Sequence, residues 1–449
     1  MPVNIKLNSI NVNGNDGYDE IEGFFLGDIR NSVLTWLNEH PDVAQNFTFP
    51  EIYGAVGDGV TPDGDAVQSA LNSGKIVVGF GTYNVSRSTP YSSGTFIGIP
   101  SGAYVINCKF KFPDSSQSMN MFSGNSFTME KCEFDMNGSN NIPTANESIY
   151  CFNIRNCNKV TFRNCHFKNS SGRNYIMVQE GKDFTLENCS FKNGGTNLSG
   201  SSASVQNDFS YCYIGAENAV INDCVILEPD ANPFTYCGGF EIHGDHFVLS
   251  NCVINKCLPA CYIANHHFDS NPLTDIKIIN NSFLNCQGGA STFNNITVDS
   301  AEISGNYIEL SPCVSSVGSV MYGVGSGTGN THKNVLIKDN VIKEASASTY
   351  GSVGVSISSA SETVISGNVF RELSNPIKLT GSNSFKNLFI KNNIAVSANT
   401  ESENFILRTT SATIDRANIS ENIYSDYAGY ISSESGITNS YVSGSIGVS

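Results

Sequence analysis

AYVINCKF, at residues 103–110, is the first of twelve copies of one short phrase, and the last copy is ANISENIY at residues 417–424. Each copy reads apolar, any, apolar, polar, turn-former, Cys or Asn, any, and then most often Phe or Ile. A phrase that recurs every 24 to 35 residues is typical of a stacked repeat protein. The Cys or Asn, called the marker below, falls at Cys108, Cys132, Cys165, Cys189, Cys224, Cys252, Asn281, Asn306, Asn340, Asn368, Asn393 and Asn422.

The spacing inside the phrase indicates which kind of repeat this is. In FTLENCSF, at residues 184–191, the apolar residues alternate, skip one place at Glu187-Asn188 and then alternate again. This pattern predicts two short strands joined by a sharp bend. Asn, Asp or Gly precedes the marker in ten of the twelve copies, and these residues tolerate the backbone of a bend. We therefore expect an all-β, right-handed parallel β-helix, a single-stranded solenoid of about twelve coils stacked ~4.8 Å apart.

Composition narrows the possible functions. Only 15% of the residues are charged, and the formal net charge is −16. With no basic surface to neutralise phosphates, we expect no binding to nucleic acid. No segment approaches the length of a transmembrane helix, and residues 1–14 lack a signal-like apolar run. We therefore expect no membrane insertion, and folding in a reducing cytoplasm.

The fourteen cysteines are predicted to be reduced packing residues. Six of them occupy the marker position, which parallel stacking would place in one inward column. A zinc site is disfavoured, because Cys257 and Cys261 lack a second pair at finger spacing. Gly57-Asp58-Gly59 lacks the Lys and Ser/Thr of a phosphate-binding loop, and Asp58, Asp63 and Asp65 miss the spacing of a calcium loop. The sequence predicts no metal and no cofactor.

Three regions follow along the chain. Residues 1–49 form an N-terminal arm and a linker helix, because Ile29, Val33, Trp36 and Leu37 lie at helical spacing between Asp28 and Pro41. This apolar stripe would either cap the end of the solenoid or associate with copies of itself about an axis. Residues 50–429 form the β-helix. Residues 430–449 lack another clear marker and are interpreted as a C-terminal cap or an interchain tail.

Two motifs in the second region resemble a known family. IYGAVGDGVTPDGDAVQSAL, at residues 52–71, is followed by KIVVGFGTY at residues 75–83. Together they resemble the opening motif of the pectate-lyase-like β-helix superfamily of phage tailspikes and tail-appendage proteins, in which the first stretch opens a capping helix. Pro62-Asp63-Gly64-Asp65 departs from the usual Asp-Asp-Thr, which shifts the expected start of that helix. The resemblance covers about residues 50–425.

The resemblance implies a function but no specific reaction, because the superfamily includes lyases, hydrolases, epimerases and inactive binding proteins. It implies a phage tailspike-like depolymerase that binds and cleaves a bacterial surface or capsular polysaccharide. It also implies a homotrimer in the virion tail that is joined to other phage tail proteins through its N-terminus. Such a protein would be made in the host cytoplasm and would act extracellularly. A receptor-binding tail protein that grips the glycan without cutting it is the alternative.

The strands about ten residues before each marker phrase suggest where chemistry occurs. In five of them, alternation places Phe152, Ile176, Cys212, Phe240 and Cys261 inside. Glu241 and His243 then face outward, with Tyr213 and Tyr262 in the equivalent places of the coils on either side. A carboxylate between two tyrosines is a plausible sugar site. Long insertions in residues 135–330 would wall this face as a groove.

The candidate residues follow from that face and its adjoining loops. A hydrolase needs two carboxyl groups, so Glu241 would pair with Asp208, Asp230, Asp245 or Asp269. A lyase that acts on a uronic acid polymer needs a base and a group that neutralises the carboxylate, for which Tyr213, Tyr262, His243 and Arg173 are available. The predicted catalytic residues are Glu241, His243, Asp208 and Asp245. The predicted substrate-binding residues are Tyr213, Tyr262, Asn153, Arg155, Arg173, Gln179, Tyr211 and His266.

Overall fold

The computed structural model describes residues 35, 39, 41, 45–92, 94–113, 120–138, 150–170, 174–194, 210–227, 238–264, 272–292, 297–311, 321–326, 332–345, 352–380, 384–396, 404–408, 412–425, 427, 429–431, 437–443 and 446–448. The chain divides into two compact units, Met1–Phe47 and Thr48–Ser449. Of the first unit little is described, although Thr35, Glu39 and Pro41 are helical. The apolar stripe Ile29, Val33, Trp36 and Leu37 lies outside the described residues.

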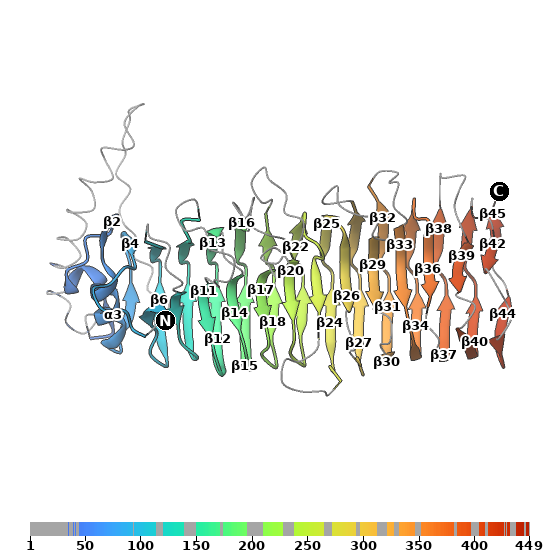
Figure 1. The fold of residues 1–449 in the computed structure, drawn as a ribbon, viewed down its shortest axis with the longest axis horizontal. Coiled ribbons are helices and arrows are strands. Elements are labelled where there is room, and N and C mark those ends of the chain that lie inside the picture. Colours follow the sequence, from blue (N-terminus) through green and yellow to red (C-terminus); the bar gives the residue numbers. More distant parts are fainter. Residues whose placement is uncertain are drawn as a thin grey trace, which may run out of the picture. The chain divides into compact units, whose positions relative to one another are not determined.

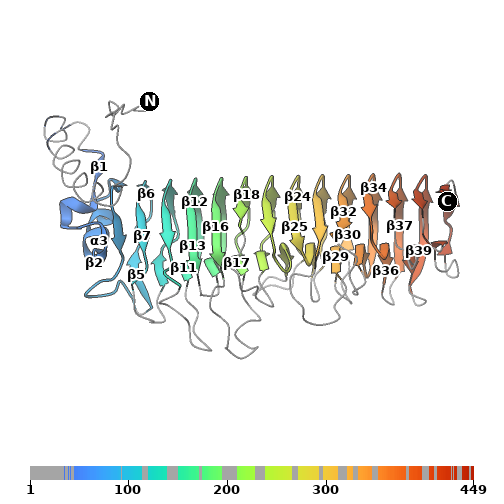
Figure 2. The ribbon, with the colours of Figure 1, turned by 90° about the horizontal axis from the view of Figure 1, so that it is seen from above.

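The second unit is an all-β parallel solenoid with three sheets, which confirms the predicted fold class (Figure 1 and Figure 2). A typical coil contributes one strand to sheet C, then one to sheet A and one to sheet B, and every coil-to-coil strand pairing is parallel, as between β12 (Cys157–Arg163) and β15 (Gly181–Glu187). Sheet A contains β1 (Phe47–Thr48), β3 (Ile76–Val78), β6 (Ala103–Ile106), β9 (Phe127–Glu130), β12, β15, β18 (Val220–Asn222), β21 (Val248–Ser250), β24 (Ile276–Ile279), β27 (Ala301–Ser304), β30 (His332–Lys333), β31 (Val335–Lys338), β34 (Ala360–Ser366), β37 (Ser384–Lys391), β40 (Thr413–Ser420), β43 (Ile437–Thr438) and β44 (Tyr441–Ser443).

In the other two sheets, neighbouring strands also follow one another in chain order. Sheet B contains β2 (Asp58–Pro62), β4 (Thr82–Asn84), β7 (Lys109–Lys111), β10 (Glu133–Asp135), β13 (His166–Ser170), β16 (Ser190–Gly194), β19 (Val225–Ile226), β22 (Val253–Asn255), β25 (Ser282–Cys286), β28 (Tyr307–Leu310), β32 (Val341–Glu344), β35 (Val369–Arg371), β38 (Ile394–Val396), β41 (Ile423–Ser425) and β45 (Ile446–Val448). Sheet C contains β5 (Thr95–Gly98), β8 (Asn120–Ser123), β11 (Tyr150–Ile154), β14 (Asn174–Val178), β17 (Ser210–Ile214), β20 (Gly238–Ile242), β23 (Cys261–Ile263), β26 (Gly288–Thr292), β29 (Met321–Ser326), β33 (Ser352–Ile357), β36 (Asn375–Leu379), β39 (Asn404–Arg408) and β42 (Gly429–Ile431).

The repeated phrase forms the bend between sheets A and B. In the copy at residues 184–191, β15 ends at Glu187, Asn188 makes the turn and β16 begins just after the marker Cys189. The residue before the marker has a positive φ in all twelve copies, including the two that are neither Asn, Asp nor Gly, Lys131 at 53° and Glu421 at 58°. The left-handed backbone there makes the corner, and the favoured residue types reduce its cost.

The markers form a buried column, as predicted, but its two halves are stabilised differently. The cysteine half is a stack of buried thiols. In the asparagine half, the side chains of Asn281 to Asn393 each bond to the marker of the next coil: Asn306 Nδ2 donates to Asn340 Oδ1 over 2.9 Å, and the same oxygen accepts the Asn306 N–H over 3.0 Å. Asn340 repeats both bonds with Asn368. This asparagine ladder satisfies backbone N–H groups that the bend removes from the sheets.

The opening motif forms the predicted capping helix, α3 (Gly64–Asn72), after a short 3₁₀ helix, η1 (Pro50–Tyr53). Asp63 stands at the N-cap, yet its carboxylate bonds elsewhere, to the N–H groups of Val56 at 2.7 Å and Gly57 at 3.1 Å. Asp63 thus ties the preceding turn to the start of the helix. At the other end, where a cap or tail is expected, β43, β44 and β45 extend sheets A and B beyond residue 430.

The twelve described cysteines are buried and form no disulfide; Cys237 and Cys313 lie outside the described residues. Burial raises the pKa of the Cys151 and Cys212 thiols well above the ordinary value, which lowers their reactivity. We expect thiol titration of unfolded, unreduced protein to count close to fourteen groups. A count near zero would show that the cysteines are paired.

Candidate functional site

The outer face of sheet C carries one continuous column of side chains across five coils. Asn153 pairs with Met177, Met177 with Tyr213, Tyr213 with Glu241 and Glu241 with Tyr262. The register confirms the expected juxtaposition of Glu241 with a tyrosine on each neighbouring strand. Glu241 lies on β20, between β17 and β23, with strands about 4.8 Å apart.

Glu241 is held at both carboxylate oxygens. Its Oε1 lies 2.9 Å from Nε2 of His243, and its Oε2 lies 3.0 Å from the hydroxyl of Ser210. The Glu241 side chain is 15% exposed and that of His243 only 6%. Two fixed partners around one half-buried carboxyl group constitute a preorganised arrangement suited to acid–base chemistry.

His243 is in turn fixed by Tyr213. The two rings stack with centroids 4.2 Å apart and planes inclined by 22°. Tyr213 is buried, so the ring face expected to be open to a sugar is covered by the imidazole. The structure therefore gives Tyr213 a supporting position beneath His243. Tyr262, on the other side, is only partly buried and remains the aromatic residue able to contact a ligand.

Tyr211 was expected on the outer face, and the structure contradicts this. Tyr211 and Cys212 are consecutive residues and both are fully buried. Strict alternation fails because β17 begins at a corner of the coil, where two successive side chains turn inward. Tyr175 shows the same behaviour: it is fully buried and its hydroxyl donates to the carbonyl of Lys192 on sheet B over 2.5 Å. Tyr211 packs on Tyr175 and is a core residue.

A second outward column runs beside Glu241. Arg155 and Gln179 are the first residues after β11 and β14, and they lie in register with Gly215 and His243 of the next two coils. The backbone hydrogen bonds from Gln179 to Ile154 and from His243 to Ile214 establish this register. Arg155 is exposed and Gln179 half-buried, so both are accessible to a ligand. Asn153 has its Oδ1 buried without a hydrogen-bond partner.

Of the remaining predicted residues, only Asp245 is described, and its side-chain hydrogen bond lies outside this cluster. Asp245 follows β20, and its Oδ1 accepts the N–H of Thr274 from the next coil over 2.8 Å, which ties the turn to its neighbour. Asp208, Asp230, Asp269, Arg173 and His266 lie outside the described residues. So do most residues of the long insertions between sheets B and C. Ser210 and the buried Asn174 belong to the cluster although no sequence pattern singled them out.

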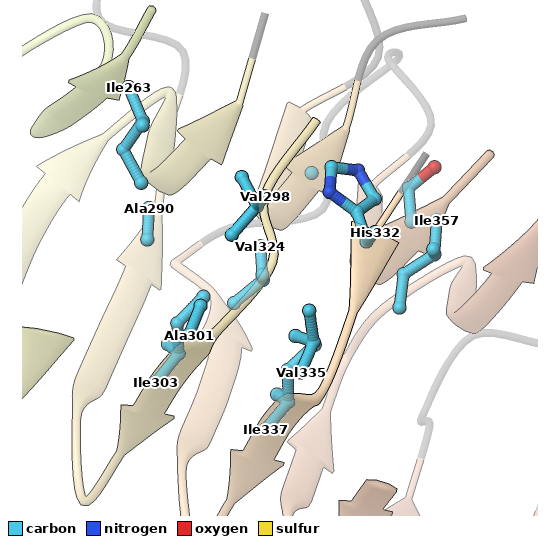
Figure 3. Close-up of a pocket in the computed structure, with 12 residues that line it drawn as sticks. Ile263, Ala290, Val298, Ala301, Ile303, Val324, His332, Val335, Ile337 and Ile357 are labelled. Carbon is cyan, nitrogen blue, oxygen red and sulfur yellow. The ribbon is translucent and has the colours of Figure 1, made fainter. Parts of the chain in front are cut away.

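A void of about 30 Å³ lies further along the core, between sheets C and A. Small and branched apolar residues line it, among them Ala290, Ala301 and Val335, and His332 is the one ionisable residue among its described lining residues (Figure 3). His332 is 4% exposed and its Nε2 has no hydrogen-bond partner. We interpret the void as a packing defect, because a water there would have too few polar partners.

The buried imidazole predicts acid sensitivity. Burial lowers the pKa of His332 from 6.5 to about 4. Between these values the unfolded chain binds a proton that the folded chain does not, so stability is lost as the pH falls from 6.5 to 4. The loss reaches about 3 kcal/mol. Urea midpoints across this range should fall less steeply for His332→Leu than for wild type. The exposed-histidine variant His166→Gln should follow wild type; equal slopes for all three would contradict the assignment.

Within the described residues, no group of three His, Cys, Asp or Glu side chains could hold a metal ion. The described part of the chain also contains no helix that is long and apolar enough to cross a bilayer.

Comparison with known proteins gives similarity in structure only. The chain matches no protein-family model and no curated protein sequence. A mutant tailspike protein of Escherichia coli bacteriophage HK620, in complex with a hexasaccharide, is similar over 89% of this chain and 79% of its own, with a TM-score of 0.61 and 12% identity. The A-module of the mannuronan C-5 epimerase AlgE4 of Azotobacter vinelandii covers 89% and 100%, with a TM-score of 0.55 and 16% identity.

A third similar structure is PfbA, a surface adhesin of Streptococcus pneumoniae, over 87% of this chain and 93% of its own, with a TM-score of 0.54 and 16% identity. At these identities the likeness establishes the fold alone. The chain is a parallel β-solenoid, and the solved structures similar to it include phage tailspike proteins, a mannuronan epimerase module and a surface adhesin.

Proposed function

We propose that this protein binds and cleaves a bacterial surface polysaccharide on the outer face of sheet C. The observation that carries the proposal is Glu241, a half-buried carboxyl group bonded to His243 and flanked in register by Tyr213 and Tyr262. The bound oligosaccharides of the similar tailspikes support a glycan ligand for this fold. Tyr262, Gln179 and Arg155 are proposed to contact the sugar, because they remain accessible around the pair.

Two reactions fit the pair of Glu241 and His243. In a hydrolase Glu241 protonates the leaving oxygen, and a second carboxyl group, Asp208 or Asp245, activates water or attacks. In a lyase His243 or Tyr262 removes the proton next to a uronic carboxylate that Arg173 neutralises. The glycosidic C–O bond at the adjacent carbon then breaks, which leaves an unsaturated sugar, and the leaving oxygen takes a proton from Glu241 or from water. The similar structure of a mannuronan C-5 epimerase module supports considering the lyase reaction, because that protein is named for a reaction on a uronic acid polymer.

The products distinguish these reactions. Purified protein should be incubated with capsular and surface polysaccharides of candidate hosts. New reducing ends with ultraviolet absorbance from an unsaturated sugar would identify a lyase, and reducing ends alone a hydrolase. Binding without any product would support a non-catalytic receptor-binding protein, which the similar adhesin makes a specific alternative. The absence of both binding and product on the host polymer would contradict the proposal.

We also propose that the protein is a homotrimer of the virion tail that attaches to other tail proteins through residues 1–49. The support is the tailspike likeness and the apolar stripe Ile29, Val33, Trp36 and Leu37, which needs a partner. Light scattering should give a mass about three times that of the 48.3 kDa chain. A monomer mass at micromolar concentration would contradict this, and Trp36→Glu should shift the mass downward if the stripe forms the contact.

A further inference from the structure

The outer face of sheet B changes from polar to apolar along the solenoid. From β7 to β41 the second residue of each strand packs in the core, so the first residue points outward. In β7 and β10 these first residues are Lys109 and Glu133. From β19 to β41 they are Val, Ile or Tyr in seven strands of eight, and the exception is Ser282. These eight residues form one column in register from Val225 to Ile423, called the sheet B ridge below.

The sheet B ridge is accessible on the single chain. Val253 is 36% exposed, Ile394 is 40% exposed and Ile423 is 41% exposed. Seven steps between strands make the ridge about 34 Å long, and three residues across each strand give the face a width of about 10 Å. The ridge therefore dominates a face of roughly 340 Å². Soluble monomers rarely expose a larger apolar patch, which indicates an interaction surface.

Two properties of the ridge point to a second copy of this chain as the partner. Its repeat equals the strand spacing, so a partner covers it over its whole length only if that partner is straight and has the same repeat. Another solenoid of this chain meets both conditions. The charges beside the ridge are already paired, because Lys343 Nζ lies 2.6 Å from Glu309 Oε2 and 5.5 Å from the centre of the Tyr307 ring. Covering paired charges costs less than covering single ones.

We infer that copies of this chain pack with their sheet B ridges against one another, side by side and parallel, around an axis that follows the solenoid. The ridge supplies less than half of the about 800 Å² that each partner buries in a standard interface. It therefore suits a closed ring, in which every chain contacts two others, better than an isolated dimer. The arrangement rests on the homotrimer proposed above but not on the glycan site, because Glu241 lies on sheet C.

Ile394→Asp in the full chain tests the contact. Carboxylates from equivalent positions would face one another, and these like charges should weaken assembly by about 10²-fold or more. The light-scattering mass at micromolar concentration should fall from the wild-type value to that of the 48.3 kDa chain. Val253→Asp, five coils away on the same ridge, should act alike. Circular dichroism should stay that of the wild type, because both side chains lie outside the core.

Phe389→Asp is the matched control. Phe389 is 39% exposed on sheet A of the same coil, so its replacement should leave the mass unchanged. A trimer mass for Ile394→Asp, or an equal loss of mass for Phe389→Asp, would overturn the ridge contact and leave the proposed trimer standing. A monomeric wild type would overturn both. A trimer that dissociates in the ridge variants but acts on no glycan would support the contact and contradict the proposed glycan function.

A cross-linking variant covers the case in which Ile394→Asp does not fold. Parallel packing brings equal positions of neighbouring copies together, so oxidation of Ile394→Cys with copper phenanthroline should link two chains through residue 394. The linked dimer should appear on a denaturing gel without reductant, and the wild type should give none. Absence of the link in assembled Ile394→Cys would overturn the ridge contact.

Discussion

Glu241→Gln should lower the turnover of the polysaccharide by about 10²–10⁴-fold, the range expected for loss of a positioned acid–base group. The amide retains the shape of the carboxyl group and both neighbours, but it cannot exchange a proton with His243. Because the side chain is 15% exposed and changes no volume, the melting temperature and oligomer mass should stay those of the wild type. Product release at saturating polymer measures the effect.

Matched variants separate chemistry from binding at this site. Tyr262→Ala should weaken glycan binding with a smaller effect on turnover, because it removes a contact surface and not the acid. Asp245→Asn should change turnover little if Asp245 only ties its turn to Thr274. A loss for Asp245→Asn equal to that of Glu241→Gln would make Asp245 the second carboxyl group of a hydrolase. If Glu241→Gln retains wild-type turnover, Glu241 is not the catalytic acid, and the candidates become Asp208, Asp230, Asp245 and Asp269.

The second large effect concerns stability and is expected for Asn340→Ala. The Asn340 side chain makes four hydrogen bonds: its Oδ1 accepts from the N–H and Nδ2 of Asn306, and its Nδ2 donates to Asn368 Oδ1 and the carbonyl of Ile303. Alanine leaves the buried N–H of Asn306 without its acceptor. Each unsatisfied buried group costs about 1–3 kcal/mol, so the total loss should reach about 3 kcal/mol.

Cys189→Ala is the matched control from the other half of the marker column. Its thiol makes long contacts to carbonyl oxygens, at 3.4 and 3.6 Å, and weak contacts to the neighbouring cysteines of the column, so the loss should be roughly 1 kcal/mol from the small cavity. Urea unfolding monitored by circular dichroism compares the two variants, and hydrogen exchange at Asn306 locates the damage. If Asn340→Ala costs no more than Cys189→Ala, the asparagine ladder does not stabilise the solenoid.

The fold could be predicted because the repeated phrase encodes local geometry. Alternation sets the strands, and a residue such as Asn188 permits the left-handed bend. The prediction from alternation fails at the corners of the coils. Tyr211 was placed outward by strict alternation, yet two successive side chains turn inward where β17 begins. Likewise Asn was visible at the later markers, but its bonds to the next coil depend on stacking.

The site could be predicted only in part. The register of Tyr213, Glu241 and Tyr262 follows from aligning repeats, and the structure confirms it. The stacking of Tyr213 on His243 depends on rotamers, which the sequence does not encode in any simple pattern. Ser210 and Asn174 stand before the strand pattern begins, so no periodicity marked them. Their hydrogen bonds, from Asn174 to Ser210 and from Ser210 to Glu241, form only when the coils are stacked.

The most direct test of a glycan site on sheet C is a crystal structure of Glu241→Gln with an oligosaccharide prepared from the host polymer. The inactive variant should trap an uncleaved chain on the outer face between β11 and β23, against Tyr262 and within hydrogen-bond distance of residue 241. A glycan bound at another face of the solenoid or between chains, with residue 241 out of reach, would contradict the account.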